Sequence, residues 1–401
     1  MSQRRWFLQT SLYLGASWPL WLRSSLSSVS APVKVKKKGE MIYRQLGRTG
    51  FYVSEISLGS SPLPEWGLFR EIIDRGVNYI DSSHTYQGGN AERMIGRLCR
   101  EVGRDKIYVA TKFHLRPADT VSSIIRTVEG SLRRLQSDYI DVLMIHGVNH
   151  PAELTDERVL EALARLKKAG KYRYQGFSCH QNHLEVMAAA IEGNLYDVIQ
   201  IGYNVYDLKK GEKPIRTYPE YLGTSGLKPL FRRAAGQGIG LVAMKALKVG
   251  GRRQDLSQFQ TKSSSIYQAM LKWVLANPYI STVVTEMLTY QQMEEDLAVV
   301  GEHLSRAERK NLYRLVAQTS HLTCRMCGTC QKVCPQSIPL PTILRYLYYF
   351  EIQQKYSLAK EAYARLKPAL KECLSCRQCE ENCPYQLPVQ DLFQSAQKIL
   401  A

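Results

Sequence analysis

Acidic residues are in deficit in this chain. Its 401 residues include 36 aspartates and glutamates against 54 lysines and arginines, which gives a formal net charge of +18. The basic residues are scattered and form no recognisable nucleic-acid module. This argues against nucleic acid as a partner, and the positive surface instead suits an anionic membrane or an acidic redox protein. The length and the 44% hydrophobic content predict one large domain with its own core and one smaller domain.

A long apolar run is also missing at the start of the chain. Residues 1–30 contain no acidic residue, and their apolar stretch, 12–22, is too short for a comfortable transmembrane helix. Ahead of it stand Arg4 and Arg5, followed by one residue and then Phe-Leu. This pattern resembles a twin-arginine signal, which predicts a signal region over 1–31 and export of the folded protein to the periplasm. The alternatives are a membrane anchor that is not cleaved, or a disordered basic leader on a cytoplasmic protein.

Cysteine is rare until the C-terminal end of the chain, where eight of the ten cysteines lie. They form two runs of one pattern, Cys-x-x-Cys-x-x-Cys-x-x-x-Cys-Pro, which consist of Cys324, Cys327, Cys330 and Cys334, and of Cys373, Cys376, Cys379 and Cys383. Three cysteines spaced by two residues let one turning loop wrap three corners of an iron–sulfur cube, and the fourth thiolate comes from elsewhere. The pattern predicts two [4Fe-4S] clusters. Cys334 would ligate the cluster held mainly by the second run, and Cys383 would ligate the cluster of the first.

Zinc and disulfides are the alternatives for these cysteines. Structural zinc usually takes two separated pairs and requires neither a third evenly spaced cysteine nor a following proline. Disulfides suit small secreted frameworks with irregular spacing, and cysteines two residues apart on one tight loop are poorly placed to bridge each other. Iron–sulfur ligation is therefore the favoured interpretation. It also agrees with the twin-arginine pattern, because a cluster is held only by a folded chain and that export route carries folded cargo.

The middle of the chain alternates short apolar runs with amphipathic, helix-like segments such as 120–135 and 155–169. Repeated alternation of strand and helix over about 250 residues predicts a parallel (β/α)8 TIM barrel of the α/β class. In that fold the chemistry lies at the ends of the strands. The expected strands are 55–59, 78–81, 107–112, 141–146, 174–178, 198–203, 239–245 and 280–285.

The same patterns predict the order of the domains. A basic spacer over 32–40 follows the signal region, the barrel occupies 41–300, and a linker helix spans 301–322. The cysteines then lie in a small, mainly helical, ferredoxin-like domain over 323–401, with helix candidates between the two runs.

Reactive side chains stand at the ends of three expected strands. Asp81 and Tyr86 follow the second strand, Lys112 closes the third, and His146 closes the fourth. The order of these residues and of Gly-Phe-Ser at 176–178, and their positions at strand ends, resemble the pattern of the aldo-keto reductase superfamily. The chain as a whole is similar to the subgroup that carries a C-terminal ferredoxin-like extension.

The resemblance implies a role for each of these side chains. A carbonyl that receives hydride becomes an alkoxide and needs a proton donor, but a free tyrosine, with a pKa of about 10, gives up its proton reluctantly near neutral pH. By resemblance Tyr86 is the acid or base, and Lys112 lowers its pKa. Asp81 keeps Lys112 charged, and His146 orients or polarises the substrate oxygen. The alternative is a structural ion pair of Asp81 and Lys112, with Tyr86 as packing.

The nicotinamide-binding positions match the family less completely. Ser178 and Gln200 occupy positions that hold the carboxamide in the family, while Met244 stands in place of the aromatic residue that stacks on the nicotinamide ring. Lys245 is placed to reach a phosphate. After the eighth strand, acidic residues and glutamines over 286–296 replace the basic pocket expected for the 2′-phosphate of NADP. NAD, NADP bound in another way, and no working nicotinamide therefore all stay open.

These observations predict an exported oxidoreductase that interconverts a small-molecule carbonyl and an alcohol, while the two clusters relay electrons to or from a redox partner protein or a membrane electron carrier. One alternative is an NAD(P)H-dependent aldo-keto reductase whose clusters are structural. Another is an electron-transfer protein whose barrel has lost turnover. Hydride carries two electrons and a cluster moves one, and the sequence shows no recognisable flavin site that would split the pair.

Overall fold

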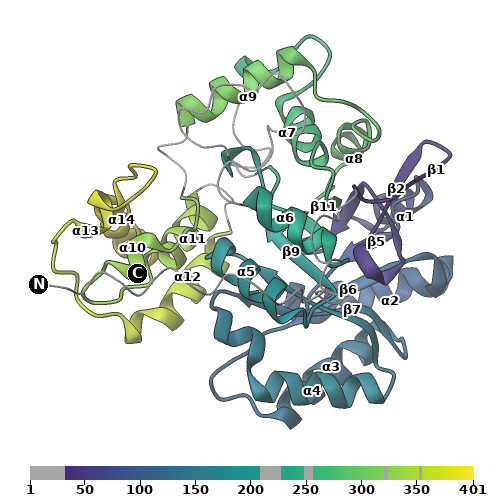
Figure 1. Ribbon diagram of the computed structural model, residues 1–401, viewed down its shortest axis with the longest axis horizontal. Helices are drawn as coiled ribbons and strands as arrows, with labels where there is room; N and C mark the ends of the chain where they lie inside the picture. The colour runs from purple at the N-terminus through teal and green to yellow at the C-terminus, as the bar shows by residue number, and fades with distance from the viewer. Residues whose placement is uncertain (1–31, 208–226, 248–255, 320–323, 352–354) are drawn as a thin grey trace, which may run out of the picture.

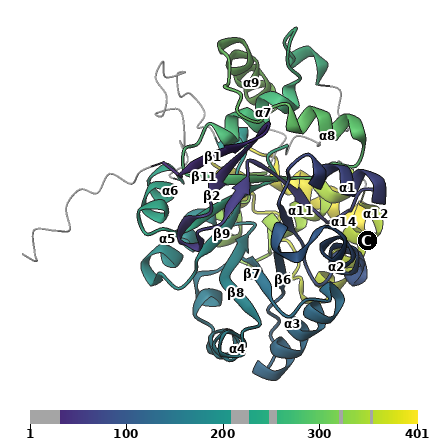
Figure 2. The ribbon, with the colours of Figure 1, turned by 90° about the vertical axis from the view of Figure 1, so that its right-hand side faces the viewer.

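The described part of the chain folds into a closed barrel with a helical domain beside it. The computed structural model describes residues 32–207, 227–247, 256–319, 324–351 and 355–401, so the predicted signal region lies outside the described residues. Within these ranges eight parallel strands close in the order β10-β11-β4-β5-β6-β7-β8-β9, with helices around them (Figure 1 and Figure 2). The predicted α/β barrel is confirmed. Its strands are β4 (Ile56–Gly59), β5 (Tyr79–Asp81), β6 (Tyr108–Phe113), β7 (Ile140–Val148), β8 (Tyr172–Cys179), β9 (Val198–Gly202), β10 (Gly240–Met244) and β11 (Ile280–Thr285).

Five of the helices outside the barrel, α1, α3, α4, α7 and α8, begin at a residue whose side chain caps the helix. At the start of α3, the Thr120 hydroxyl accepts from the Ser123 N–H and the Ser123 hydroxyl accepts from the Thr120 N–H, which is a capping box. The two helices predicted over 120–135 and 155–169 are found as α3 and α4. The helices of this part are α1 (Trp66–Asp74), α2 (Asn90–Val102), α3 (Val121–Leu135), α4 (Glu157–Lys168), α5 (His183–Gly193), α6 (Leu227–Gly236), α7 (Ile266–Leu275), α8 (Tyr290–Leu297) and α9 (Arg306–Thr319).

Part of the predicted basic spacer is a strand. Val35–Lys38 forms β1, which pairs antiparallel with β2 (Met41–Gln45), and β2 pairs antiparallel with β3 (Tyr52–Ser54). Gly39, with a φ of 61°, allows the turn between β1 and β2. All side chains of β1 are exposed, so backbone pairing holds this strand and burial does not. A run of lysines shows no apolar alternation, which is why the sequence did not predict it.

Side chains that face the inside of the barrel alternate along each strand. Toward the N-terminal end the interior is apolar, and Phe51, next to β3, stacks on Tyr108 with 4.3 Å between ring centroids. Successive side chains of a strand point to opposite faces, so the residue two positions further along also faces inward. At the C-terminal ends of the strands these positions are mostly polar. They hold Asp81, Lys112, His146, Ser178, Gln200 and Met244.

The second domain is helical in its described part, as predicted. Each cysteine run passes into a short helix, α10 (Thr329–Lys332) or α13 (Gln378–Glu381). A longer helix follows each, and a further helix packs against both. These three are α11 (Leu340–Glu351), α14 (Val389–Leu400) and α12 (Tyr356–Leu366). Their buried apolar face includes Ile343, Leu347, Ala359 and Phe393. No helix among the described residues combines the length and the hydropathy needed to cross a membrane.

The helical domain lies against the C-terminal mouth of the barrel. The N–H of Asn182, just before α5, donates to the carbonyl oxygen of Met326 at 3.1 Å. Gly328 has a φ of 82°, and a Cβ at this position would lie 2.0 Å from Asn182 Oδ1, so only glycine fits here. Lys332 of α10 pairs with Glu185 of α5. The domain therefore meets the barrel at the end where the polar inward side chains lie (Figure 1).

Candidate functional site

The four predicted catalytic residues meet at the mouth of the barrel. Lys112 Nζ donates to Asp81 Oδ1 at 2.5 Å and to the Ser82 carbonyl oxygen at 2.7 Å. The side chains of Lys112 and Asp81 are almost fully buried. The same Nζ lies 5.3 Å from the centroid of the Tyr86 ring, and that ring lies 5.8 Å from the ring of His146. The structure thus brings all four side chains into one cluster.

A row of histidines runs beside Tyr86. His146 stacks on His114 with 4.1 Å between ring centroids, and its centroid lies 5.8 Å from that of His180. Ser83 Oγ lies 3.0 Å from His146 Nδ1 and fixes the orientation of this ring. Burial lowers the pKa of all three histidines, to about 4 for His114. His146 therefore meets a substrate at neutral pH as a neutral imidazole.

Tyr86 holds its proton tightly. Burial raises the pKa of the phenol well above its ordinary value, and the Asp81 carboxylate raises it further. Burial lowers the pKa of Lys112, while Asp81 opposes that shift. Lys112 is predicted to lower the pKa of Tyr86, and this contribution stays a prediction; the net shift is upward, with burial as its leading cause. The phenol is therefore protonated at neutral pH, which is the form that a proton donor needs.

The predicted nicotinamide contacts surround the same mouth. Ser178 Oγ accepts from the Gly147 N–H at 2.9 Å, and Gln200 Nε2 lies 3.8 Å from Met244 Sδ. The other polar atom of the Gln200 side chain, Oε1, is buried and has no hydrogen-bond partner in the described structure. A carboxamide N–H₂ would satisfy this acceptor, so these residues fit a nicotinamide.

Besides Met244, two positions depart from the pattern that the chain resembles. Cys179 stands next to Ser178 where that pattern has an asparagine, and Glu286 stands where it has a basic residue. Cys179 donates its thiol proton to the Gln181 carbonyl oxygen at 3.0 Å, and burial raises its pKa to about 12. It therefore does not replace the expected asparagine as a polar contact. Glu286, after β11, pairs with Lys355 of the helical domain at 3.8 Å. The segment expected to hold the 2′-phosphate instead makes a contact between the domains.

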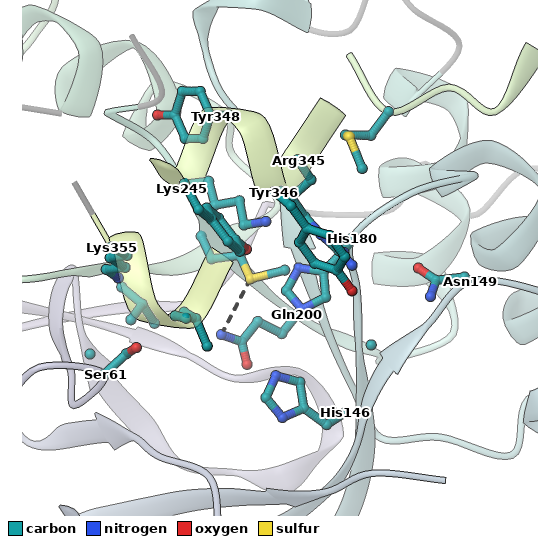
Figure 3. A pocket seen from close by; sticks show the side chains of 18 of the residues that line it. Ser61, His146, Asn149, His180, Gln200, Lys245, Arg345, Tyr346, Tyr348 and Lys355 are labelled. Carbon is teal, nitrogen blue, oxygen red and sulfur yellow. Dashed lines mark hydrogen bonds between the residues drawn. The ribbon is translucent and has the colours of Figure 1, made fainter. Parts of the chain in front are cut away.

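A cavity of about 1470 Å³ lies between the barrel mouth and α11, and we call it the mouth cavity. Its lining includes Tyr86 and His146 from the barrel and Arg345, Tyr346 and Tyr349 from the helical domain. Figure 3 shows the Tyr346 ring beside His180, on the side of the pocket that α11 covers. Tyr349 is close enough to Tyr86 to raise its pKa.

Sequence reasoning missed these α11 side chains and His180. A helix that follows the first cysteine run shows an apolar face, but no local pattern states which surface that face covers. The available signal was the aromatic run Tyr346-Leu-Tyr-Tyr-Phe350, which is denser in aromatics than a buried helix face needs.

The eight cysteines gather in two groups, and each group combines both runs. The first group surrounds the buried thiol of Cys330, whose pKa is raised by burial, by the thiols of Cys324, Cys327 and Cys383, and last by that of Cys379, which lies with the second group. The second group lines a small cavity and consists of Cys334, Cys373, Cys376 and Cys379. Cys334 thus lies with the second run, and Cys383 lies with the first.

Each group offers the donor set of a cubane iron–sulfur cluster, which takes four thiolates. Among the described residues, no group of three or more histidines, cysteines, aspartates or glutamates is close enough together to hold a single metal ion. A cubane spreads its four thiolates over four iron corners, so its ligands need not converge on one point. The residues present therefore fit such clusters.

The two cysteine groups differ in where they lie. Cys324 of the first group lines the mouth cavity, together with the neighbouring residues Arg325 and Met326. In the second group Cys376 is exposed, and Leu374 beside it is 58% exposed. The first group therefore borders the cavity that the catalytic side chains line, and each group reaches the surface through one exposed cysteine, Cys327 or Cys376.

Comparison with known proteins matches both parts of the chain. The family described as Aldo/keto reductase family matches residues 67–258, and the one described as 4Fe-4S dicluster domain matches 318–384. L-galactose dehydrogenase of Arabidopsis thaliana is 26% identical over 296 residues, which cover 65% of this chain and 88% of that protein. The uncharacterized oxidoreductase YrpG of Bacillus subtilis is 26% identical over 312 residues, which cover 66% of this chain and 93% of that protein.

Solved structures agree on the fold. A thermostable aldo-keto reductase in complex with the inhibitor epalrestat is 25% identical, with a TM-score of 0.54, and covers 68% of this chain and 99% of its own. An aldo-keto reductase of Klebsiella pneumoniae in complex with NADPH is 24% identical, with a TM-score of 0.53, and the match covers 68% of this chain and 93% of that protein. The fold of the larger part of this chain is therefore that of aldo-keto reductases.

The mixed cysteine groups predict how double substitutions combine. Cys334→Ser should remove the cluster of the second group and lower the iron content from about eight to about four atoms per chain. Adding Cys376→Ser should remove no further iron, whereas adding Cys327→Ser should remove nearly all of it. Iron analysis and the EPR signal after dithionite reduction measure this, with Cys99→Ser in the barrel as the control. If Cys334→Ser with Cys327→Ser kept about four irons, the groups would not be interleaved.

Proposed function

We propose, from the premise that this chain carries an aldo/keto reductase family domain followed by a 4Fe-4S dicluster domain, that it interconverts a small-molecule carbonyl and an alcohol and relays electrons through two [4Fe-4S] clusters. The protein is an oxidoreductase of aldo-keto reductase type. One observation carries the proposal of a relay. Cys324 of the first cysteine group lines the same cavity as Tyr86 and His146.

The proton chemistry follows from the buried phenol. In the direction of reduction, Tyr86 donates its proton to the alkoxide oxygen, and the Lys112 ammonium, 5.3 Å from the ring, balances the phenolate that remains. When Ser83 donates to His146 Nδ1, the imidazole proton stays on Nε2, which is the tautomer that donates to a carbonyl oxygen. In the direction of oxidation the phenolate takes the proton back.

The cofactors supply the electrons. Ser178, Gln200 and Met244 would hold a nicotinamide, which would supply or accept hydride. The cysteine groups would hold clusters that supply one-electron transfer. Both NAD and NADP stay candidates. In the region where a 2′-phosphate would be recognised, the cation of Lys355 is paired with the carboxylate of Glu286, so the region neither clearly attracts nor clearly repels a phosphate.

The net charge of the chain indicates the kind of electron partner that could approach the second cysteine group. Cys376 and Leu374 lie at the surface, and the chain as a whole carries a net charge of +18. A positive protein attracts negative partners over distances comparable to the Debye length. We therefore propose an acidic redox protein, or a carrier at an anionic membrane surface, as the partner.

A second function is favoured by the position of α11. Arg345 and Tyr346 form part of the wall of the mouth cavity. A reductase would need that wall even if the iron–sulfur clusters only stabilised the helical domain. The protein would then be an NAD(P)H-dependent aldo-keto reductase with structural clusters. A third function is that of an electron carrier whose barrel has lost turnover. In that case the four buried side chains around Tyr86 would have no catalytic role.

Tyr86→Phe tests whether the barrel turns over. The substitution removes the proton donor and keeps the ring, so reduction of 4-nitrobenzaldehyde with NADPH or NADH should fall by at least about a hundredfold. The rate of nicotinamide oxidation by anaerobically purified holoprotein measures this. The EPR signal after dithionite should stay unchanged, and Tyr356→Phe, at an exposed site of α12, should keep wild-type turnover. Equal rates for Tyr86→Phe and wild type would remove Tyr86 from the mechanism.

The relay is tested by the source of reducing electrons. In wild-type holoprotein, NADH or NADPH should produce the same EPR signal as dithionite, because the first cysteine group borders the cavity that holds the nicotinamide. Anaerobic titration with each nicotinamide, followed by EPR, measures the reduced fraction. Aldehyde turnover without any cluster signal from nicotinamide would support structural clusters and contradict the relay.

We further propose that the chain is exported folded by the twin-arginine route. The support is the pattern at Arg4 and Arg5, which lies outside the described residues. A short apolar stretch follows it, and a cluster protein requires a route for folded cargo.

Replacing Arg4 and Arg5 together by lysine should abolish export of a reporter fused after residue 40. The substitution keeps the positive charge and removes only the arginine pair that the signal pattern requires. Reporter activity in the periplasmic fraction measures the outcome, with Arg23→Lys in the same leader as the control. Export that persists in the double variant contradicts the twin-arginine route.

A further inference from the structure

Two cations of the mouth cavity, one from each domain, lack an acidic partner among the described residues. Lys245 directly follows β10, and Arg345 lies on α11; both line the cavity. Neither forms an ion pair with any described carboxylate, and Arg345 Nε is buried without a hydrogen-bond partner in the described structure. Of the other cations that line the cavity, Arg158 pairs with Asp156 and Lys355 pairs with Glu286. Arg325 donates to the Tyr206 carbonyl oxygen and lies over the Tyr206 ring, and Arg116 forms no ion pair with a described carboxylate.

The two cations act on each other and on the catalytic histidines. Burial lowers the pKa of Lys245 to about 7, and the Arg345 guanidinium contributes to this shift. The pKa of His180 is lowered by burial and by both cations, and Lys245 also acts on His146. Figure 3 shows Lys245 next to the α11 ribbon that carries Arg345, on the side of the pocket that faces His180 and Gln200.

Such an arrangement is unfavourable without an anion. Two like charges that are partly removed from water repel each other and lose solvation, and either loss of the Lys245 proton or a compensating negative group relieves both costs. His180 Nδ1 is also buried without a hydrogen-bond partner in the described structure. The wall of the cavity nearest the histidine row therefore offers two positive groups and an open imidazole nitrogen.

We propose that Lys245 and Arg345 together bind the carboxylate of the substrate, so that the substrates are hydroxy acids and the corresponding oxo acids. This deepens the proposed carbonyl–alcohol chemistry and rests on it. The guanidinium matches the two oxygens of a carboxylate, and the ammonium adds a point charge beside it. Because Arg345 belongs to the helical domain, that domain selects the substrate as well as carrying cysteines.

Malonate, a carboxylate that cannot be turned over, tests this site without relying on catalysis. Isothermal titration of anaerobic holoprotein should show binding, and Arg345→Gln or Lys245→Met should weaken it by about ten- to a hundredfold, the loss expected for a charge-assisted hydrogen bond. Arg345→Lys should retain part of the affinity. Lys398→Gln, which removes an exposed cation of α14 outside the lining of the cavity, should leave malonate binding unchanged. Dimethyl malonate, which has the same skeleton without the charge, should not bind.

The diphosphate of a nicotinamide has related anionic chemistry, and a second titration separates the two sources. If Arg345→Gln and Lys245→Met weaken NADPH binding and leave malonate binding unchanged, the anion belongs to the cofactor and the substrate assignment is overturned. Absence of malonate binding by the wild type, or equal affinity in all variants, overturns it as well. Malonate binding requires no turnover, so a wild type that binds malonate but reduces no carbonyl would count against the proposed function and not against the anion site.

Discussion

Closure of eight parallel strands is the constraint on which the rest of this structure depends. Once the barrel closes, each strand delivers its last inward side chain to one ring at the C-terminal end. Strands β5 and β6 are neighbours in that ring, which places the carboxylate of Asp81 2.5 Å from Lys112 Nζ. A lysine in such a dry position would lose its charge without that carboxylate. The buried ion pair beneath Tyr86 is thus a direct result of strand adjacency.

The cover that α11 provides sets the protonation of the side chains below it. Burial is the leading cause of the pKa shifts of Tyr86, His114 and His146, and α11 contributes to that burial by closing over the cavity they line. An open mouth would let water solvate the charged forms and return these groups toward their ordinary pKa values. The contact between the two domains therefore belongs to the acid–base chemistry, although none of the cysteines takes part in that chemistry.

Sequence patterns predicted the features that depend on local periodicity and spacing, namely the barrel strands and the cysteine runs. The strand ends that carry Lys112 and His146 follow from alternation of apolar runs, and the fourth cysteine of each run follows from a fixed spacing. Features that depend on which surfaces meet were not predicted. Arg345 stands on a helix whose apolar face gives no sign that its polar side faces the barrel, and the sign of the Tyr86 shift depends on how dry that contact is. The lysine-rich β1 was missed because its side chains are all exposed and show no apolar alternation.

The mixed composition of the two cysteine groups limits how this domain can change in evolution. Each group takes one thiol from the opposite run, Cys334 in one case and Cys383 in the other. A deletion of the second run would leave the first group with three thiols, and the mirror-image deletion would do the same to the second group. The domain therefore cannot be shortened to a version with one complete site by losing either half. The two halves must be inherited together, even though each resembles a unit that could be duplicated or discarded.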